Sequence, residues 1–265
     1  MEKYLLLETE NHEIPAILTY PDCDDKVPAI ILCHGTASNK DEVGNLFKDL
    51  ANQLLEHNIA CLRIDFVGFG DSKEAESSLT FLNEVEDAYK AYTYLKELTF
   101  VDSNKLGILG FSQGARVMAE LLNRAHDFRF AISWSGTCHN GIGHFQSWFD
   151  EYYKEASLNG VAMMKMDWRE DLPLSKAWFD EIRDTKPMEG IKGFKNPILA
   201  IAGTDDVVVP WKHAEEIIDN STHKDSRSLI ISGADHIYNV LSNDHSIATM
   251  MLNMTVDWIL SIIKE

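Results

Sequence analysis

The segment Gly110-Phe111-Ser112-Gln113-Gly114 constrains the fold of this chain more than any other. An apolar run, 106–109, precedes it, and the helix-favouring residues 115–122 follow it. A strand, a sharp turn and a helix with serine at the apex predict a nucleophile elbow, which lifts the serine hydroxyl clear of a sheet. The two glycines allow the strand and the helix to approach without a Cβ clash. Ser112 is therefore the candidate nucleophile.

Apolar runs and helical spacings alternate along most of the chain. Strands are predicted at 27–33, 59–64, 105–111, 130–134, 198–202 and 228–231. Helices are predicted at about 41–57, 81–98, 114–125, 211–219 and 245–263. Residues 4–8 and 13–20 flank Asn11-His12 and predict an antiparallel hairpin. Strands that alternate with helices indicate right-handed crossovers and a mostly parallel sheet with helices on both faces, so we expect one α/β domain over residues 1–265.

Residues 137–190 interrupt this alternation. The segment lacks the apolar strand runs of its surroundings but holds eight of the chain's 26 aromatic residues. One interpretation is a small helical subdomain with its own core, and the other is a cap whose apolar underside covers the mouth of the sheet. Both can hold at once. On the second interpretation, Trp148, Trp168 and Trp178 are candidate substrate-binding residues.

Composition excludes several functional classes. The chain has 24 Lys and Arg against 42 Asp and Glu, a formal net charge of −18. Such an acidic surface repels phosphate backbones and anionic lipids, so we expect neither nucleic-acid nor membrane partners. The N-terminus lacks a signal-peptide pattern, and no stretch approaches the roughly 20 apolar residues of a membrane span. The four cysteines form no C-x-x-C motif, which favours a reducing, cytoplasmic setting.

Two later strand ends carry the partners that a serine nucleophile needs. Acyl transfer requires a general base beside the hydroxyl and a carboxylate to orient that base. Residues 203–206 end one predicted strand with Asp205 and Asp206, and residues 233–236 end the next with Asp235 and His236. Asp235 is disfavoured because neighbouring side chains point apart. His236 is therefore the predicted base, and the residues alone leave Asp205 and Asp206 open as the acid.

Other histidines are given different roles. His34, at a strand end before the nucleophile, is expected to brace its loop through its ring nitrogens. His139 and His144, with Cys138, suggest a metal site only weakly, because no fourth ligand follows them in the sequence. We therefore expect no metal and no cofactor. The remaining histidines are expected to face solvent: His12, His57, His126, His213, His223 and His245.

Backbone N–H groups are predicted to hold the developing oxyanion. One belongs to Gln113, which follows the nucleophile at a helix N-terminus, where the helix dipole also favours negative charge. The other is expected in the loop after the strand at 27–33, at Thr36. The G-x-G at Gly68 and Gly70 lacks a third glycine and an immediate helix, so it predicts a structural loop rather than a phosphate site.

Five ordered segments resemble the α/β-hydrolase superfamily. They are Cys33-His34-Gly35-Thr36, Asp65-x-x-Gly68-x-Gly70-x-Ser72, Gly110-x-Ser112-x-Gly114, Gly203-x-x-Asp206-x-x-Val209-Pro210 and Gly233-Ala234-Asp235-His236. The resemblance runs from about residue 12 to the C-terminus and implies an eight-stranded sheet whose first hairpin is antiparallel. In the family's G-x-x-D-x-x-V-P pattern the acid is the fourth residue, which selects Asp206.

Within that superfamily the chain is similar to bacterial cinnamoyl (feruloyl) esterases. The shared segments are His34-Gly35-x-x-x-Asn39-Lys40, Arg63-Ile64-Asp65-Phe66, Gly203-Thr204-Asp205-Asp206 and Gly233-Ala234-Asp235-His236. Those enzymes cleave hydroxycinnamate esters and hold the aromatic acid with an inserted cap. Two departures are Phe111, where the elbow commonly has histidine, and Trp178-Phe179, where those esterases place a tyrosine for the phenolic hydroxyl.

These observations together predict a cofactor-independent serine hydrolase of carboxylic esters. Ser112 would attack, His236 would move the proton, Asp206 would orient His236, and the N–H groups of Thr36 and Gln113 would hold the oxyanion. A peptidase or thioesterase with the same triad, and a non-catalytic ligand-binding homologue, are the alternatives. The expected partner is a small-molecule ester, and the choice between monomer and homodimer stays open.

Overall fold

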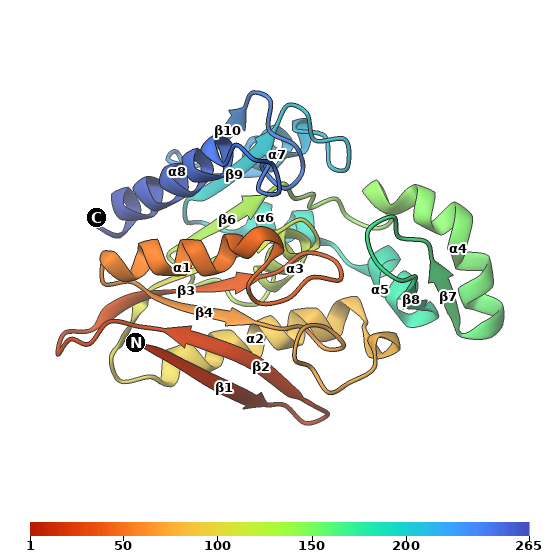
Figure 1. Ribbon diagram of the computed structural model, residues 1–265, viewed down its shortest axis with the longest axis horizontal. Coiled ribbons are helices and arrows are strands. Elements are labelled where there is room, and N and C mark those ends of the chain that lie inside the picture. Colours follow the sequence, from red (N-terminus) through yellow and green to blue (C-terminus); the bar gives the residue numbers. More distant parts are fainter. Residues whose placement is uncertain (265) are drawn as a thin grey trace.

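An eight-stranded sheet runs through the centre of the molecule (Figure 1). The computed structural model describes residues 1–264. The strands are β1 (Glu2–Glu8), β2 (Glu13–Thr19), β3 (Val27–Cys33), β4 (Ala60–Ile64), β5 (Val101–Phe111), β6 (Phe130–Trp134), β9 (Ile198–Gly203) and β10 (Arg227–Ile231). Their order is β1-β2-β4-β3-β5-β6-β9-β10. β2 pairs antiparallel with β1 and β4, and the other pairs are parallel, which confirms the predicted sheet.

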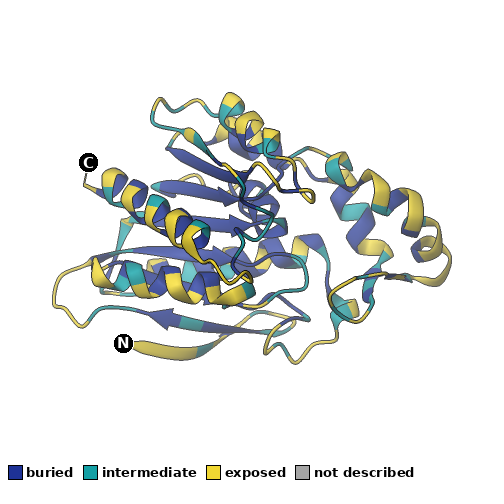
Figure 2. Cartoon of the chain, turned by 45° about the horizontal axis from the view of Figure 1, so that its top comes forward, coloured by how far each residue is buried: buried dark blue, intermediate teal, exposed yellow. Residues whose placement is uncertain are grey.

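Helices cover both faces of the sheet. α1 (Leu46–Glu56) and α8 (Ser246–Ile263) pack on one face, and α2 (Phe81–Glu97), α3 (Gln113–Leu121) and α7 (Lys212–Asn220) pack on the other. Side chains alternate between the two faces along a strand, so in β3 Ile31 joins one core and Leu32 the other. Every residue of β4, β6 and β9 is buried, and the sheet is dark blue between helices whose outer sides are exposed (Figure 2). This double cover explains the continuous apolar runs in the sequence.

The closing helix, α8, is apolar enough to pass for a membrane span. Its 18 residues have a mean hydropathy of 1.5, and 44% of them are buried inside the molecule. By length and composition alone, this helix contradicts the expectation that no stretch approaches a membrane span. Packing also explains this hydropathy, because Met251, Ile259 and Ile262 belong to the hydrophobic core that α8 shares with α1.

Residues 137–190, which we call the insert, lie beyond the carboxyl ends of the parallel strands (Figure 1). Its elements are α4 (Gln146–Asn159), β7 (Val161–Met164), β8 (Leu172–Ser175) and α5 (Lys176–Asp184), and α6 (Pro187–Gly193) begins at its end. β7 and β8 form an antiparallel pair, so the insert combines helices with a small sheet and is not the helical subdomain of the first interpretation. Each strand is only four residues long, too short for its alternation to stand out in the sequence.

The buried guanidinium of Arg116 ties the insert to the helix that follows the elbow. It donates hydrogen bonds to the carbonyl oxygens of His139 (2.6 Å), Gly141 (2.9 Å) and Ile182 (3.0 Å). These carbonyls come from both ends of the insert. Because Arg116 is four residues after Ser112 on α3, the position of the insert is fixed relative to the candidate nucleophile.

Candidate active site

Ser112 occupies a sharp turn between β5 and α3. Its backbone has φ 51° and ψ −114°, a strained conformation for a residue with a side chain. The Ser112 N–H donates to Trp134 O at 2.8 Å, which anchors the turn to β6. A Cβ at Gly110 would overlap the Gly114 carbonyl, and one at Gly114 would overlap that of Cys33. Both glycines are therefore required by close backbone approach, as the elbow motif implies.

The structure brings Ser112, His236 and Asp206 together from three loops. His236 follows β10, and its Nε2 lies 3.1 Å from Ser112 Oγ. Its Nδ1 lies 2.8 Å from Asp206 Oδ2, in the loop after β9. The Asp206 side chain is fully buried, and its other oxygen accepts the N–H groups of Val208 (2.8 Å) and Val209 (2.7 Å). The carboxylate is thus held in one orientation toward the ring, which can donate Nδ1–H to it and receive a proton at Nε2.

The two competing aspartates point elsewhere. Asp205 is exposed, and its Oδ1 accepts the Thr204 hydroxyl at 2.9 Å. Asp235 Oδ1 accepts the N–H groups of Ile237 (3.0 Å) and Asn239 (2.7 Å), so it shapes the turn that carries His236. The choice between Asp205 and Asp206, which the residues alone left open, is therefore decided by orientation in favour of Asp206.

The loop after β3 presents Thr36 beside the nucleophile. Within residues 1–264, the N–H groups of Thr36 and Gln113 have no hydrogen-bond acceptor, and both residues line the same cavity as Ser112. A Cβ at Gly35 would lie 3.4 Å from that of Ser112, which shows how closely the loop approaches. Two free donors converging near a hydroxyl oxygen are the arrangement that an oxyanion requires.

Glu42 holds this loop in place, and the sequence reasoning missed it. Its carboxylate accepts hydrogen bonds from the Gly35 N–H at 2.7 Å, the Ser38 hydroxyl at 2.6 Å and the Val43 N–H at 2.8 Å. Glu42, Gly44 and Asn45 all have a positive φ (60°, 60° and 65°), so α1 begins at Leu46 and not near 41. A single glutamate before a helix carries no sequence signal of this role, because two of its three partners are backbone N–H groups.

His34 braces the base of the loop, as the sequence analysis expected. The fully buried ring donates from Nδ1 to Gly35 O at 2.7 Å and accepts the Phe66 N–H at Nε2, 3.0 Å away. Burial lowers the pKa of His34, so the ring is neutral and can do both. The Gly68–Gly70 turn is structural as well: Gly70 packs on Asp65, whose carboxylate binds Lys40 Nζ at 2.7 Å.

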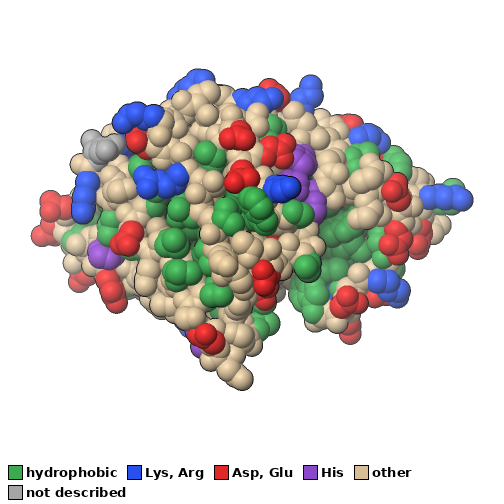
Figure 3. Space-filling model, turned by 90° about the horizontal axis from the view of Figure 1, so that it is seen from above, with side chains coloured by type: hydrophobic (Ala, Val, Ile, Leu, Met, Phe, Trp, Pro, Cys, Tyr) green, Lys and Arg blue, Asp and Glu red, His purple; other side chains and the backbone are tan. Residues whose placement is uncertain are grey.

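A cavity of about 840 Å³ opens above Ser112, between the sheet and the insert. Its apolar lining includes Phe111, Phe145, Trp148 and Met166, and hydrophobic side chains line a hollow on the face seen in Figure 3. Trp168, 64% exposed, lines it as well.

Trp178 does not line this cavity, which corrects the expectation of direct substrate contact. It is 1% exposed and stacks on Trp148 with a ring-centroid distance of 5.7 Å. Phe179 is buried beside it, with ring centroids 5.1 Å apart. These two residues support the wall of the cavity from behind.

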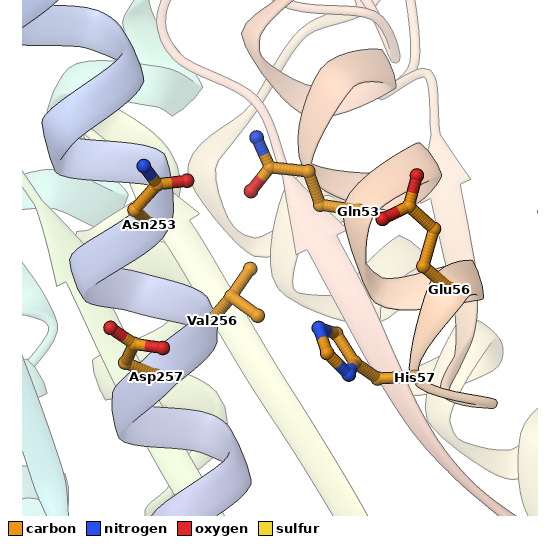
Figure 4. Close-up of a pocket in the computed structure, with 6 residues that line it drawn as sticks. All are labelled: Gln53, Glu56, His57, Asn253, Val256 and Asp257. Carbon is orange, nitrogen blue, oxygen red and sulfur yellow. The ribbon is translucent and has the colours of Figure 1, made fainter.

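A second hollow, of about 470 Å³, lies between α1 and α8. Figure 4 shows Gln53, Glu56 and His57 facing Asn253, Val256 and Asp257 across it. It is a polar groove beside the last turn of α1, lined by none of the residues predicted for catalysis.

Three histidines depart from the expectation of solvent exposure. His223 is partly buried, and its Nδ1 accepts the Asp225 N–H at 3.2 Å. His12 Nε2 lies 2.6 Å from Oδ1 of the buried Asp87, because the β1–β2 turn lies against α2. His213 is half-buried beside His139 and His144, where burial and then these two rings lower its pKa. Burial likewise lowers the pKa of His144, which lines the cavity.

Sheet order, elbow and site position together define an α/β-hydrolase fold. Residues 74–265 match the prolyl oligopeptidase family of serine hydrolases, and the chain belongs to this family. It is 28% identical over 220 residues to Esterase EstD from Thermotoga maritima, covering 76% of this chain and 52% of that protein. The chain thus spans about half the length of EstD. It is 24% identical over 242 residues to Escherichia coli YfhR, covering 90% and 72% of the two chains.

Solved structures share the fold along nearly the whole chain. Est1E from Butyrivibrio proteoclasticus, with ferulic acid bound, matches at a TM-score of 0.79 and 18% identity, over 98% of this chain and 100% of its own. The α/β hydrolase GrgF from Penicillium sp. sh18 matches at 0.77 and 15%, over 100% of both chains. These likenesses place the chain in the fold that the sequence resemblance implied.

Asp206→Asn is expected to lower kcat by about 10⁴-fold, the loss seen when the orienting carboxylate of a serine-protease triad becomes an amide. Val208 and Val209 N–H groups would keep the amide oxygen, so its NH₂ would face His236 Nδ1 and enforce the wrong tautomer. Asp205→Asn is the matched control and should change kcat less than tenfold. Equal losses in steady-state assays of the two variants would contradict the assignment.

Glu84 links stability to pH beneath the elbow. Burial raises its pKa to about 8, and its Oε2 accepts Gln113 Nε2–H at 3.0 Å. Because the folded-state pKa lies above the unfolded value, the stability that neutral Glu84 contributes is full below about pH 4.5 and is lost as pH rises toward 8.

Glu84→Gln, which mimics the neutral carboxyl, should remove this part of the pH dependence. From pH 5 to 8.5 the free energy of unfolding in urea should fall for the wild type, relative to the variant, by at least about 1.4 kcal/mol, one pKa unit. Glu86→Gln, on the exposed side of the same helix, is the control. Parallel curves for the wild type and Glu84→Gln would refute the claim.

Proposed function

We propose that this chain hydrolyses carboxylic esters through an acyl-enzyme on Ser112. The observation that carries the proposal is the continuous line of contacts from Ser112 Oγ through His236 to the buried Asp206. His236 Nε2 would take the hydroxyl proton as the oxygen attacks the ester carbonyl, while Asp206 stabilises the imidazolium and fixes its orientation. The N–H groups of Thr36 and Gln113 would receive the carbonyl oxygen as it becomes an anion.

Protonated His236 then gives its proton to the leaving alcohol, which completes the acylation of Ser112. In the second half of the reaction, water enters beside His236 and loses a proton to Nε2 as it attacks the acyl carbonyl. His236 returns that proton to Ser112 Oγ as the carboxylic acid leaves. The cavity above Ser112 provides room for this exchange.

We propose an aromatic acid, of the hydroxycinnamate class, as the acyl group. Trp148, Phe145 and Phe111 offer flat apolar surfaces next to Ser112, and aromatic rings pack favourably against such surfaces. Ferulic acid is bound to Est1E, which has the same fold. The polar lining residues Lys165, Asp167 and Asp205 are exposed and would face ring substituents or the alcohol.

A peptidase is the second candidate, because the chain belongs to the prolyl oligopeptidase family. The same triad can attack an amide if His236 protonates the leaving amine. The two activities separate when kcat/KM is compared for ester and amide derivatives of the same acyl group. A thioester of that acyl group tests the thioesterase alternative in the same assay.

The deciding experiment is a panel of esters with acetyl, butyryl, octanoyl and feruloyl groups, each paired with its amide. We expect ester hydrolysis that Ser112→Ala abolishes, with feruloyl esters preferred over acetyl esters. Trp148→Ala should lower kcat/KM for the feruloyl ester about tenfold while that for acetyl changes little, since one apolar contact discriminates by roughly 1–3 kcal/mol.

Leu158→Ala is the matched control for Trp148→Ala. Leu158 lies on the same helix, is 76% exposed and does not line the cavity, so acyl preference should not change. An amide preference would replace the ester proposal with the peptidase. An unchanged preference in Trp148→Ala would remove the aromatic acid from the proposal and leave ester hydrolysis standing.

A further inference from the structure

Three potential metal ligands meet beside the cavity, from two parts of the chain that are far apart in sequence. His139 lies in the loop after β6, and His213 and Glu216 lie one turn apart on α7. His139 Nε2 is 2.6 Å from Glu216 Oε2, and His213 Nδ1 is 3.6 Å from the same oxygen. One ligand atom of each residue lies within 4.8 Å of the others. No further ligand follows His139 and His144 in the sequence, whereas the structure brings His213 and Glu216 of α7 to His139.

The donor set and its spacing fit one class of ion. Two imidazole nitrogens and one carboxylate oxygen are ligands of Zn²⁺ and similar divalent transition metals, bound at 2.0–2.2 Å. Tetrahedral geometry at those bond lengths places ligand atoms roughly 3.3 Å apart. The two separations to Glu216 Oε2, 2.6 and 3.6 Å, bracket this value, and the two imidazole nitrogens lie within 4.8 Å of each other, so side-chain rotations can bring the three atoms around one ion. Three protein ligands leave a fourth position for water.

Both halves of the cluster are held by the surrounding structure. The His139 carbonyl accepts a hydrogen bond from the buried Arg116 at 2.6 Å, and a Cβ on Gly143 would overlap the Cβ of His139. His213 and Glu216 project from a nine-residue helix, where an i,i+3 spacing puts side chains on the same face. On the face in Figure 3, histidine side chains gather beside the hydrophobic hollow.

We propose that His139, His213 and Glu216 bind one Zn²⁺-class divalent ion that joins the first loop of the insert to α7. The loop carries Thr137 and His144, and α7 follows the loop of Asp206; both loops line the cavity. The ion is structural: it lies outside the Ser112–His236–Asp206 contacts and fixes one wall of the cavity. His144 stands between this site and the cavity, its ring centroid 5.3 Å from that of His213.

The test is metal binding by tag-free protein that has been stripped with a chelator. Zn²⁺ is titrated against a chromophoric competitor, and Co²⁺ absorption reports tetrahedral nitrogen and oxygen ligation. We expect one ion per chain, a rise in Tm on saturation, and at least tenfold weaker binding in His213→Ala and in Glu216→Gln. Glu216 is exposed, so Glu216→Gln should fold and keeps the proposal testable should His213→Ala fail to fold.

Two control variants separate this site from other histidines. His126→Ala, at an exposed position after α3, and His236→Ala, in the candidate triad, should bind the ion with wild-type affinity. The proposal is overturned by the absence of saturable binding to the wild type, by unchanged affinity in the two cluster variants, or by loss of the ion in His236→Ala. In the first case the cluster is an ordinary His139–Glu216 hydrogen bond. The first two outcomes leave the proposal of ester hydrolysis unchanged.

Discussion

At Ser112 the chain passes from a buried strand into a helix within one residue, with φ at 51°. The turn requires glycine at Gly110 and Gly114. A side chain at Gly110 would overlap the Gly114 carbonyl, and one at Gly114 would overlap the Cys33 carbonyl. This constraint determines where the Ser112 hydroxyl points. Asp206 and His236 can reach it because their loops lie at the same edge of the sheet. The parallel strands deliver all three side chains to that edge.

Hydrogen bonds to the neighbouring strand and to α2 stabilise the strained backbone of this turn. Trp134 O accepts the Ser112 N–H from the neighbouring strand, and buried Gln113 bonds to Glu84 on α2. Arg116, one turn further along α3, donates hydrogen bonds to backbone carbonyls of the insert. Because the buried guanidinium is satisfied mainly by backbone oxygens, movement of any of these carbonyls would leave its charge uncompensated and would destabilise the fold. Arg116 therefore couples the position of the insert to that of the elbow. The cavity is shaped by that coupling.

The fold, and the meeting of Ser112, His236 and Asp206 at one edge of the sheet, could be predicted from the sequence because their signals are local. Continuous apolar runs indicated the buried strands, and each site residue follows such a run at a strand end. Asp206 needed more than spacing: only the structure shows that Asp205 turns toward Thr204. β7 and β8 escaped prediction because four-residue strands are too short to establish a period.

Features that depend on tertiary contacts between distant segments could not be predicted at all. Glu42 acts mainly through backbone N–H groups, those of Gly35 and Val43, which any sequence would supply. His139 and Glu216 are 77 residues apart, so their approach is a consequence of how α7 packs beside the loop after β6. Trp178 was selected as an aromatic of the insert, but its burial behind Trp148 depends on the crossing of α4 and α5.

Covalent catalysis by Ser112 can be tested by trapping the acyl-enzyme. Protein mixed with an excess of a p-nitrophenyl ester is acid-quenched within the first turnovers, digested and examined by mass spectrometry. We expect a burst of p-nitrophenol equal to the protein concentration and one acyl group on the peptide that contains Ser112. Turnover without an acylated peptide, or acylation of another residue, would contradict it.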